Sequence, residues 1–191
     1  MLSVLVIDEV ESRAGDICAG LVLAGFQVAA SLPSALDLAA KAEALKPDII
    51  LIQTDSPSRD TLEHLAVANQ ELPRPVVMFA SKGDGPVVRR AMQAGVSAYI
   101  VDGLSTRRLK PVIEVAIARF EEYQELRRER DEVTRKLADR KVIERAKGVL
   151  MKARGYDEDA AYSALRKLAM DRGTSLIKVS AQVIDMTNLL L

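Results

Sequence analysis

The sequence contains no tryptophan, one cysteine and one histidine, and aromatic residues make up 4% of its 191 positions. Cys18 allows no internal disulfide, and its apolar neighbours in a predicted helix indicate a buried structural thiol in a reducing compartment. His64 has no neighbouring cysteine or histidine, which makes a poor metal site. These absences exclude a disulfide scaffold and argue against zinc binding.

Long hydrophobic runs and an excess of charge of one sign are also lacking. The N-terminal segment MLSVLVIDEV has no basic region and falls short of the roughly 20 apolar residues that a membrane span needs. We therefore expect a cytoplasmic protein with no membrane partner. Lys and Arg number 27, as do Asp and Glu, so a nucleic-acid-binding surface has to be a local patch.

Short apolar runs alternate with helical patterns from residue 2 to about residue 117. This alternation predicts an α/β fold with a five-stranded parallel sheet covered on both faces. The strands are expected in LSVLVID, QVAAS, DIILIQ, PVVMFA and SAYIVD. In such sheets the functional crevice lies at the carboxyl ends of the strands. The polar residues expected there are Asp8, Glu9, Gln53, Asp55, Ser81 and Asp102.

After residue 113 the pattern predicts only helices, and the first of them is long. A three-four spacing of apolar residues runs along it, interrupted by Arg130 and Arg140. A thin apolar stripe on a charged helix needs a partner, which favours a dimerising coiled coil. The alternative is a solvated connector with ion pairs four residues apart. The apolar residues of the stripe are Tyr123, Leu126, Val133 and Leu137.

The last fifty residues are predicted to form three helices with short turns. Gly155 is a plausible C-cap of the long helix, Asp157 caps the next helix, and Gly173 with Thr174 repeats the pattern. One small core is expected among Val149, Leu150, Tyr162, Leu165, Leu168, Ala169, Ile177, Val179 and Ile184.

Positive charge is concentrated in residues 140 to 154. This segment holds six basic residues and one acid, a local charge of +5 in a neutral chain. Such a patch suits phosphate contacts, although a charge run can also be only a solvated face. Gly148 lies inside the predicted helix, where glycine costs about 1 kcal/mol relative to alanine. We interpret Ala146 and Gly148 as small residues that let an RNA backbone or base approach closely.

The first half, roughly residues 1 to 118, resembles the receiver domain of two-component response regulators. The resemblance lies in the strand-helix pattern, the acidic pair Asp8 and Glu9, and Ser81 after the fourth strand. In that family the acidic pair and an aspartate ending the third strand bind Mg²⁺. That aspartate accepts a phosphoryl group, and a lysine ending the fifth strand contacts it.

Two of these functional parts are replaced in this sequence. Pro57 follows Gln53 by four residues, which puts Gln53 at the acceptor position, and Asp102 falls at the place of the lysine. An amide cannot form an acylphosphate. The resemblance therefore implies a degenerate receiver that signals by binding a partner. Asp8 and Glu9 are kept as a candidate Mg²⁺ site, with no other cofactor expected, and Asp55 as a candidate substitute acceptor.

Residues 144 to 184 resemble the ANTAR domain of transcription antitermination regulators. The shared elements are the A-x-G-x-L-M run that begins at Ala146, the Gly155 turn and the second helix with Tyr162, Leu165, Arg166 and Met170. The domain order also matches: a receiver at 1–118, a coiled-coil connector at 119–140 and an ANTAR module at 141–191. The stretches TDSPSRDTLEHL and VDGLS further resemble the nitrate-assimilation, NasT-like branch.

This second resemblance implies RNA binding. Members recognise paired stem-loops in a nascent leader mRNA and prevent formation of the terminator hairpin, and a coiled-coil homodimer would supply two RNA-binding modules. Lys147 and Lys152 are the predicted phosphate contacts, Arg145 and Arg166 the predicted phosphate or loop-base contacts, and Ala146 and Gly148 the points of close approach. Tyr162 is interpreted as a core residue.

In the nitrate branch an inhibitory partner that senses nitrate or nitrite holds the regulator, and no phosphorylation is needed. We therefore expect a regulator and not an enzyme. Two alternatives stay open: a phosphorylation-dependent response regulator with a DNA-binding helical output, and a protein-interaction adaptor that uses the coiled coil.

Overall fold

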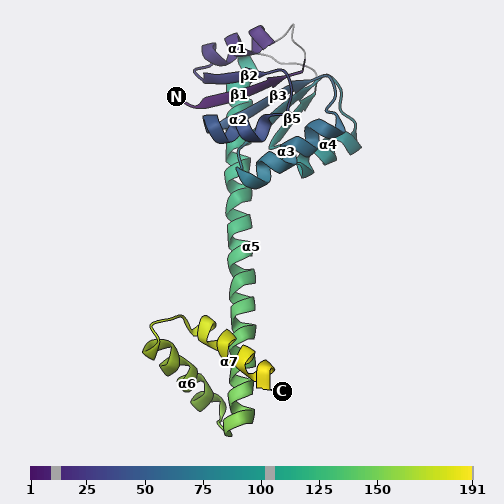
Figure 1. Cartoon of the computed structure of the whole chain (residues 1–191). Helices are drawn as coiled ribbons and strands as arrows, with labels where there is room; N and C mark the ends of the chain where they lie inside the picture. The colour runs from purple at the N-terminus through teal and green to yellow at the C-terminus, as the bar shows by residue number, and fades with distance from the viewer. Residues whose placement is uncertain (10–13, 102–105, 191) are drawn as a thin grey trace. The chain divides into compact units, whose positions relative to one another are not determined.

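The computed structural model describes residues 1–9, 14–101 and 106–190 (Figure 1). The chain divides into two compact units, Met1–Gln124 and Glu125–Leu191, and the long helix α5 (Thr106–Arg154) has residues in both. Among the described residues, none of the helices is long and apolar enough to cross a membrane. The two units are described separately.

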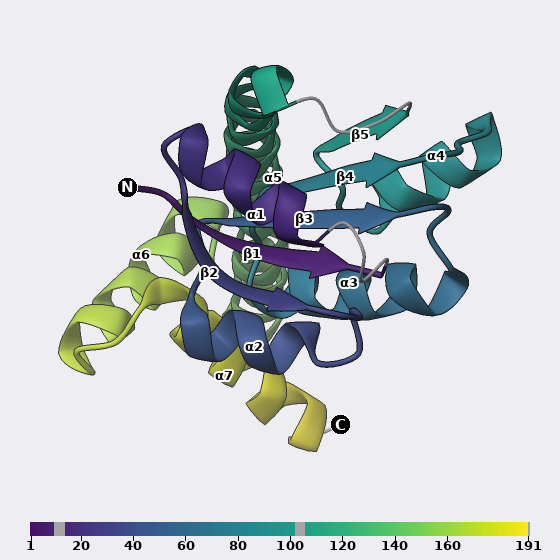
Figure 2. The ribbon, with the colours of Figure 1, turned by 90° about the horizontal axis from the view of Figure 1, so that it is seen from above.

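The first unit is a parallel sheet in the strand order β2-β1-β3-β4-β5, which confirms the predicted α/β fold (Figure 2). Because neighbouring strands are parallel, their carboxyl ends lie at one edge of the sheet. The strands are β1 (Ser3–Asp8), β2 (Gln27–Leu32), β3 (Ile49–Thr54), β4 (Val76–Ala80) and β5 (Ala98–Val101). The helices between them are α1 (Ala14–Leu23), α2 (Leu38–Leu45), α3 (Arg59–Glu71) and α4 (Gly85–Gln93).

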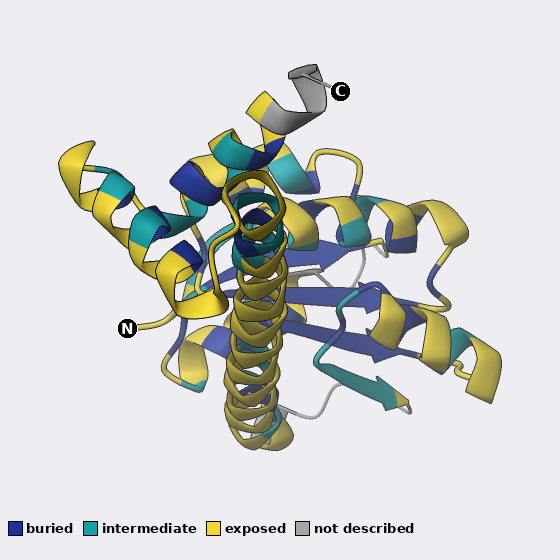
Figure 3. Cartoon of the chain, turned by 90° about the horizontal axis from the view of Figure 1, so that it is seen from below, coloured by how far each residue is buried: buried dark blue, intermediate teal, exposed yellow. Residues whose placement is uncertain are grey.

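Alternate residues of the strands enter two separate cores, one on each face of the sheet. Leu5, Ile7, Ile50 and Ile52 pack with buried residues of α2, α3 and α4. Val4, Val6, Ile49 and Leu51 pack with residues of α1 and of the start of α5. The three inner strands β1, β3 and β4 are therefore buried on both sides, which explains their continuous apolar runs, whereas the edge strands β2 and β5 are only partly buried (Figure 3). Cys18, expected to be buried, is only partly buried against the second core.

Gly95 marks a close approach in this unit. Its φ of +103° lies in the left-handed region, and a Cβ at this position would overlap the side-chain amide of Asn69. Gly25 has a similar φ of +89°, but an added Cβ would meet nothing within 4 Å. Two glycines with the same backbone requirement thus differ in the space around them.

The second unit consists of the C-terminal part of α5 with α6 (Glu158–Asp171) and α7 (Leu176–Leu190). The predicted turn is confirmed: α5 ends at Arg154, Gly155 has a φ of +67°, and Asp157 accepts a hydrogen bond from the Ala160 amide at 2.7 Å. The core of the unit consists of Ala146, Leu165, Ala169, Val179 and Ile184.

Tyr162 is not part of that core, contrary to our expectation, because its side chain is 43% exposed. It follows Ala161, which is fully buried, and one residue turns a helix by about 100°. Val149 and Ile177, also expected in the core, are half-buried.

The apolar stripe of α5 is exposed within the single chain. Leu126, Val133 and Leu137 of the second unit are 58%, 58% and 56% exposed. Arg130, which interrupts them, pairs with Asp131 at 2.8 Å. Tyr123, in the first unit, is 63% exposed. The apolar residues whose spacing indicated a coiled coil therefore lie on the surface of the single chain and not in its core.

Candidate nucleic-acid interface and receiver pocket

Asp8 and Gln53 lie side by side at the carboxyl ends of β1 and β3. The register of the two strands pairs them directly, and both are buried. The side-chain Oε1 of Gln53 has no hydrogen-bond partner among the described residues. A buried amide oxygen without a partner is costly, so an uncharged but unsatisfied group occupies the position where the receiver resemblance expects an aspartate.

The Glu9 carboxylate is held by two threonine hydroxyls. Thr54 Oγ1, from the end of β3, donates to Glu9 Oε2 at 2.6 Å, and Thr61 Oγ1, from α3, donates to Glu9 Oε1 at 2.6 Å. Both threonines are buried. Glu9 therefore ties the end of β3 to the first turn of α3. The sequence did not single out either threonine, and the only signal was a hydroxyl residue directly after Gln53.

This donor set does not fit the Mg²⁺ site that Asp8 and Glu9 were expected to provide. Mg²⁺ favours several oxygen ligands in near-ideal octahedral geometry. Here the third carboxylate is replaced by the Gln53 amide, and both Glu9 oxygens accept hydroxyl hydrogen bonds. Within the described ranges no group of three or more metal-binding side chains forms. We derive no step through a metal.

Asp55 and Ser81 meet at the same edge of the sheet. Ser81 Oγ donates to Asp55 Oδ1 at 2.8 Å, and the Lys82 amide donates to the Asp55 carbonyl at 3.1 Å. These bonds join the loops that follow β3 and β4. Asp102, predicted at the place of the receiver lysine, lies outside the described residues.

Four residues of the basic segment form a line along one face of α5, which we call the basic stripe: Lys141, Arg145, Gly148 and Lys152. Their spacings of four, three and four residues put them on one helix face, at about 100° per residue. Lys141, Arg145 and Lys152 are exposed. Cations on one face are the arrangement that a phosphate backbone can contact together.

Gly148 lies in the middle of the basic stripe and faces open space. A Cβ added there would meet nothing within 4 Å, so packing does not require a glycine. The neighbouring Ala146, also predicted to lie beside RNA, is fully buried in the core of the unit. Its small side chain lets the three helices approach each other, whereas Gly148 leaves room outside the protein.

Lys147, a predicted phosphate contact, is buried against two carboxylates. Its Nζ lies 2.9 Å from Glu144 and 2.6 Å from Glu158, and its side chain is 8% exposed. Hydrogen bonds to Glu158 and Glu144 raise the pKa of Lys147 above its ordinary value of 10.5, and the ammonium lowers the pKa of Glu158 below 4.5. Lys147 therefore links α5 to the first turn of α6, and a phosphate would have to compete with both acids.

Arg166 lies on α6 and is exposed. It shares a face with Tyr162 and Met170 at four-residue spacing, and Met170 is 72% exposed. Within the described residues, no hydrogen bond or ion pair joins Arg166 to the basic stripe. Of the predicted RNA-binding residues, the structure thus aligns Arg145, Gly148 and Lys152, and puts Arg166 on another helix.

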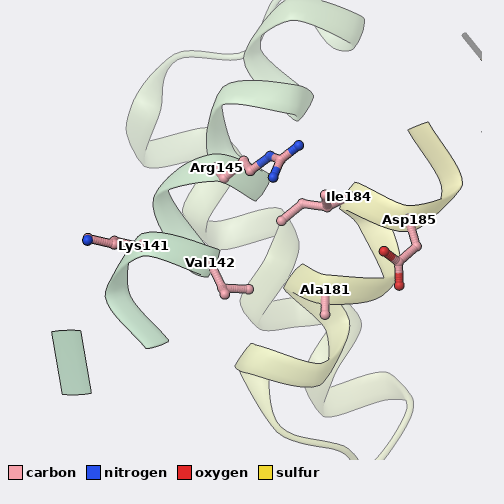
Figure 4. Close-up of a pocket in the computed structure, with 6 residues that line it drawn as sticks. All are labelled: Lys141, Val142, Arg145, Ala181, Ile184 and Asp185. Atoms are coloured by element: carbon pink, nitrogen blue, oxygen red, sulfur yellow. The ribbon is translucent and has the colours of Figure 1, made fainter. Parts of the chain in front are cut away.

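An open pocket lies beside the basic stripe, between α5 and α7 (Figure 4). Its volume is about 320 Å³. The residues that line it are Lys141, Val142, Arg145, Ala181, Ile184 and Asp185. This pocket could not be predicted from the sequence, because tertiary packing decides which face of α7 lies against α5.

Comparison with known families identifies the second unit. Residues 131–184 match the ANTAR domain. The match covers the C-terminal part of α5, all of α6 and most of α7, and so includes the basic stripe and the residues of the core.

Two curated relatives extend the comparison. The transcriptional regulatory protein PdtaR of Mycobacterium tuberculosis is 30% identical over 161 residues, which are 84% of this chain and 78% of PdtaR. The nitrate regulatory protein of Klebsiella oxytoca is 33% identical over 79 residues, which are 41% of this chain and 20% of that protein.

Solved structures agree with the fold of the first unit. The signal receiver domain of a diguanylate cyclase from Desulfovibrio desulfuricans G20 has a TM-score of 0.56 at 21% identity, over 63% of this chain and 97% of that one. A CheY-like receiver domain protein from Methanospirillum hungatei JF-1 has a TM-score of 0.56 at 20% identity, over 64% and 98%. At these identities the likeness shows a receiver-like fold.

Proposed function

This chain belongs to the family of ANTAR-domain transcriptional regulators that includes PdtaR, and on that basis we propose that it binds RNA stem-loops and acts in transcription antitermination. The observation that supports this most directly is the basic stripe, where three exposed cations flank a glycine with no packing role. Lys and Arg side chains provide phosphate contacts, and an RNA backbone or splayed base can approach a glycine closely. Binding in a leader transcript would prevent the terminator hairpin from forming.

The receiver-like unit is proposed to regulate by docking and not by catalysis. Gln53 offers an amide in place of an acceptor carboxylate, and Glu9 and Asp55 already accept hydrogen bonds from hydroxyls. We propose that the protein has no enzymatic activity and that it acts on nascent RNA in the cytoplasm. Its control comes from a partner protein that binds this unit.

The proposed partner is an inhibitory protein that senses nitrate or nitrite. Support for this finer assignment is the similarity of 79 residues to the Klebsiella oxytoca protein named a nitrate regulatory protein. Ligand binding to the partner would release the regulator, and no phosphoryl group would be transferred.

The active form is proposed to be a homodimer joined through α5. Leu126, Val133 and Leu137 lie seven and four residues apart, as on one seam of a heptad pattern, and each is more than half exposed. A dimer carries two ANTAR domains, and two paired stem-loops bound together raise the effective concentration of the second contact.

A binding titration tests the proposal. The purified protein, without any phosphodonor, is titrated against a two-stem-loop RNA, the same RNA with altered loops, and duplex DNA at several salt concentrations. We expect selective binding to the intact loops. Equal and steeply salt-dependent binding to all three would reduce the basic stripe to a general electrostatic surface, and a preference for duplex DNA that requires acetyl phosphate would favour a phosphorylated DNA-binding regulator.

A further inference from the structure

The pocket between α5 and α7 combines an apolar floor with charges of both signs. Val142, Ala181 and Ile184 contribute aliphatic side chains, and Lys141, Arg145 and Asp185 contribute charge. In Figure 4 the Arg145 side chain extends toward Ile184, and the Asp185 carboxylate lies on the α7 side of the pocket. At about 320 Å³ the volume is near the lower end of the roughly 300–1,000 Å³ found for small ligand sites.

The charged groups of the pocket are not paired with each other. Within the described part of the chain, no ion pair is formed by Arg145 or Asp185. Both residues are exposed, in contrast to Lys147, two residues after Arg145 on α5, which is buried between two acids. A cation and an anion are thus presented to solvent across an apolar surface.

A nucleobase attached to a phosphate fits this combination. The flat face of a base can lie on the aliphatic side chains, and Arg145 and Lys141 can contact phosphate oxygens. Asp185 then selects among the bases, because an ionised carboxylate only accepts hydrogen bonds. Guanine presents two adjacent donors, N1–H and the N2 amino group, on its Watson–Crick edge. Adenine, cytosine and uracil each present a donor next to an acceptor there.

We infer that this pocket binds an unstacked guanine from the loop of the RNA, with Asp185 accepting from N1–H and N2–H and Arg145 contacting phosphate. This inference rests on the proposed RNA-binding function and adds to it a base-specific position. The basic stripe continues past the pocket at Gly148 and Lys152, so the adjoining nucleotides have a surface to follow. A free guanine nucleotide shares the base and phosphate chemistry but would leave that surface uncovered.

Selection from a library of two-hairpin RNAs with randomised loops tests the inference. The wild-type protein, Asp185→Asn and Asp171→Asn are compared; Asp171 is an exposed acid on α6 outside the pocket and controls for the loss of one charge. We expect wild type and Asp171→Asn to enrich guanine at one loop position, and Asp185→Asn to lose that preference alone. A good pair of base contacts corresponds to about tenfold discrimination or more. Thermal unfolding of each variant checks that the fold is retained.

Chemical substitution makes the test sharper at the enriched position. Inosine lacks the N2 amino group, so it should weaken wild-type binding and have little effect on Asp185→Asn. An asparagine offers one acceptor and one donor, which match N1–H and O2 of xanthine, so xanthosine should restore binding to the variant.

The outcomes separate the inference from the proposed function. Loop-selective binding that keeps the same guanine preference in Asp185→Asn overturns the guanine pocket and leaves RNA binding standing. Wild-type protein that enriches no loop sequence overturns both. Saturable binding of free GMP in the pocket, without guanine enrichment in the RNA, replaces the loop base with a soluble nucleotide and also overturns the inference.

Discussion

The two units use their polar residues in opposite ways. At the carboxyl edge of the sheet, polar groups bond to one another: Glu9 to Thr54 and Thr61, and Asp55 to Ser81. On the ANTAR unit, Arg145 and Lys152 extend into solvent. Hydrogen bonds between groups of the protein stabilise its fold, whereas exposed cations attract a ligand with many negative charges. This contrast fits the two proposals that the first unit is a docking surface for a partner protein and that the second unit binds RNA.

The largest expected effect comes from disrupting the proposed homodimer, which separates its two ANTAR domains. The double change Val133→Glu and Leu137→Glu puts like charges on the exposed apolar stripe. We expect monomers, and a loss of about 100-fold or more in affinity for two-hairpin RNA because the second hairpin is no longer held at high effective concentration. Sedimentation and binding assays measure both effects. Affinity for a single hairpin should be unchanged, and a variant that still dimerises would contradict the role of this stripe.

Gly95→Ala should destabilise the receiver-like unit by about 2 kcal/mol or more, since it combines a positive φ with overlap of Asn69. The matched control is Gly25→Ala, which has a similar φ but open space. The difference between the two free energies of unfolding, from urea titrations, isolates the overlap. Equal losses would mean that the Asn69 side chain moves aside at little cost.

Gly148→Ala should stabilise the protein, in contrast to Gly95→Ala. Alanine replaces a mid-helix glycine in open space, so the free energy of unfolding of the ANTAR unit should rise by about 1 kcal/mol. Gly148→Leu should keep the fold and weaken RNA binding, since the added side chain occupies the surface that RNA approaches. Destabilisation by Gly148→Ala would show that the glycine has a packing role after all.

Glu158→Gln should give the smallest effect, because the Glu158 side chain is 69% exposed. The pKa of Glu158 is lowered by Lys147, so its contribution to stability is present above pH 4.5 and is lost as the pH falls through the lowered value. The pKa of Lys147 is raised, so the contribution of the lysine is lost only as the pH rises beyond 10.5. Wild type and variant should therefore differ at pH 7 in thermal unfolding and converge once the pH has fallen below the lowered pKa of Glu158. A constant difference would assign the effect to another contact.

The sequence predicted those features that depend on local signals. The continuous apolar run of β3 indicated a strand buried on both faces, and Gly155 with Asp157 indicated the turn between α5 and α6. The sequence could not predict which face of each helix in the second unit, the ANTAR unit, points toward the core. Ala146 faces the core and Gly148 faces solvent because α6 and α7 pack on one side of α5, which is a tertiary choice.

The same limit applies to charged residues. Lys147 was grouped with the other cations, since a sequence gives no sign that Glu158 lies beside it across a turn. Thr54 and Thr61 were missed for the same reason: they meet Glu9 from distant parts of the chain. Asp185 was not singled out from the sequence, and only the fold puts it in the same pocket as Arg145.

The most direct test of the central claim is the salt dependence of RNA binding by two matched double variants. Arg145→Ala with Lys152→Ala removes two cations of the basic stripe; Arg128→Ala with Arg135→Ala removes two exposed cations of α5 outside it. The stripe variant should lose about 100-fold in affinity at low salt, with a slope of log affinity against log salt that is shallower by about 1.5 to 2, and the control should match wild type. Equal losses in the two variants would contradict an RNA-binding surface on this face of α5.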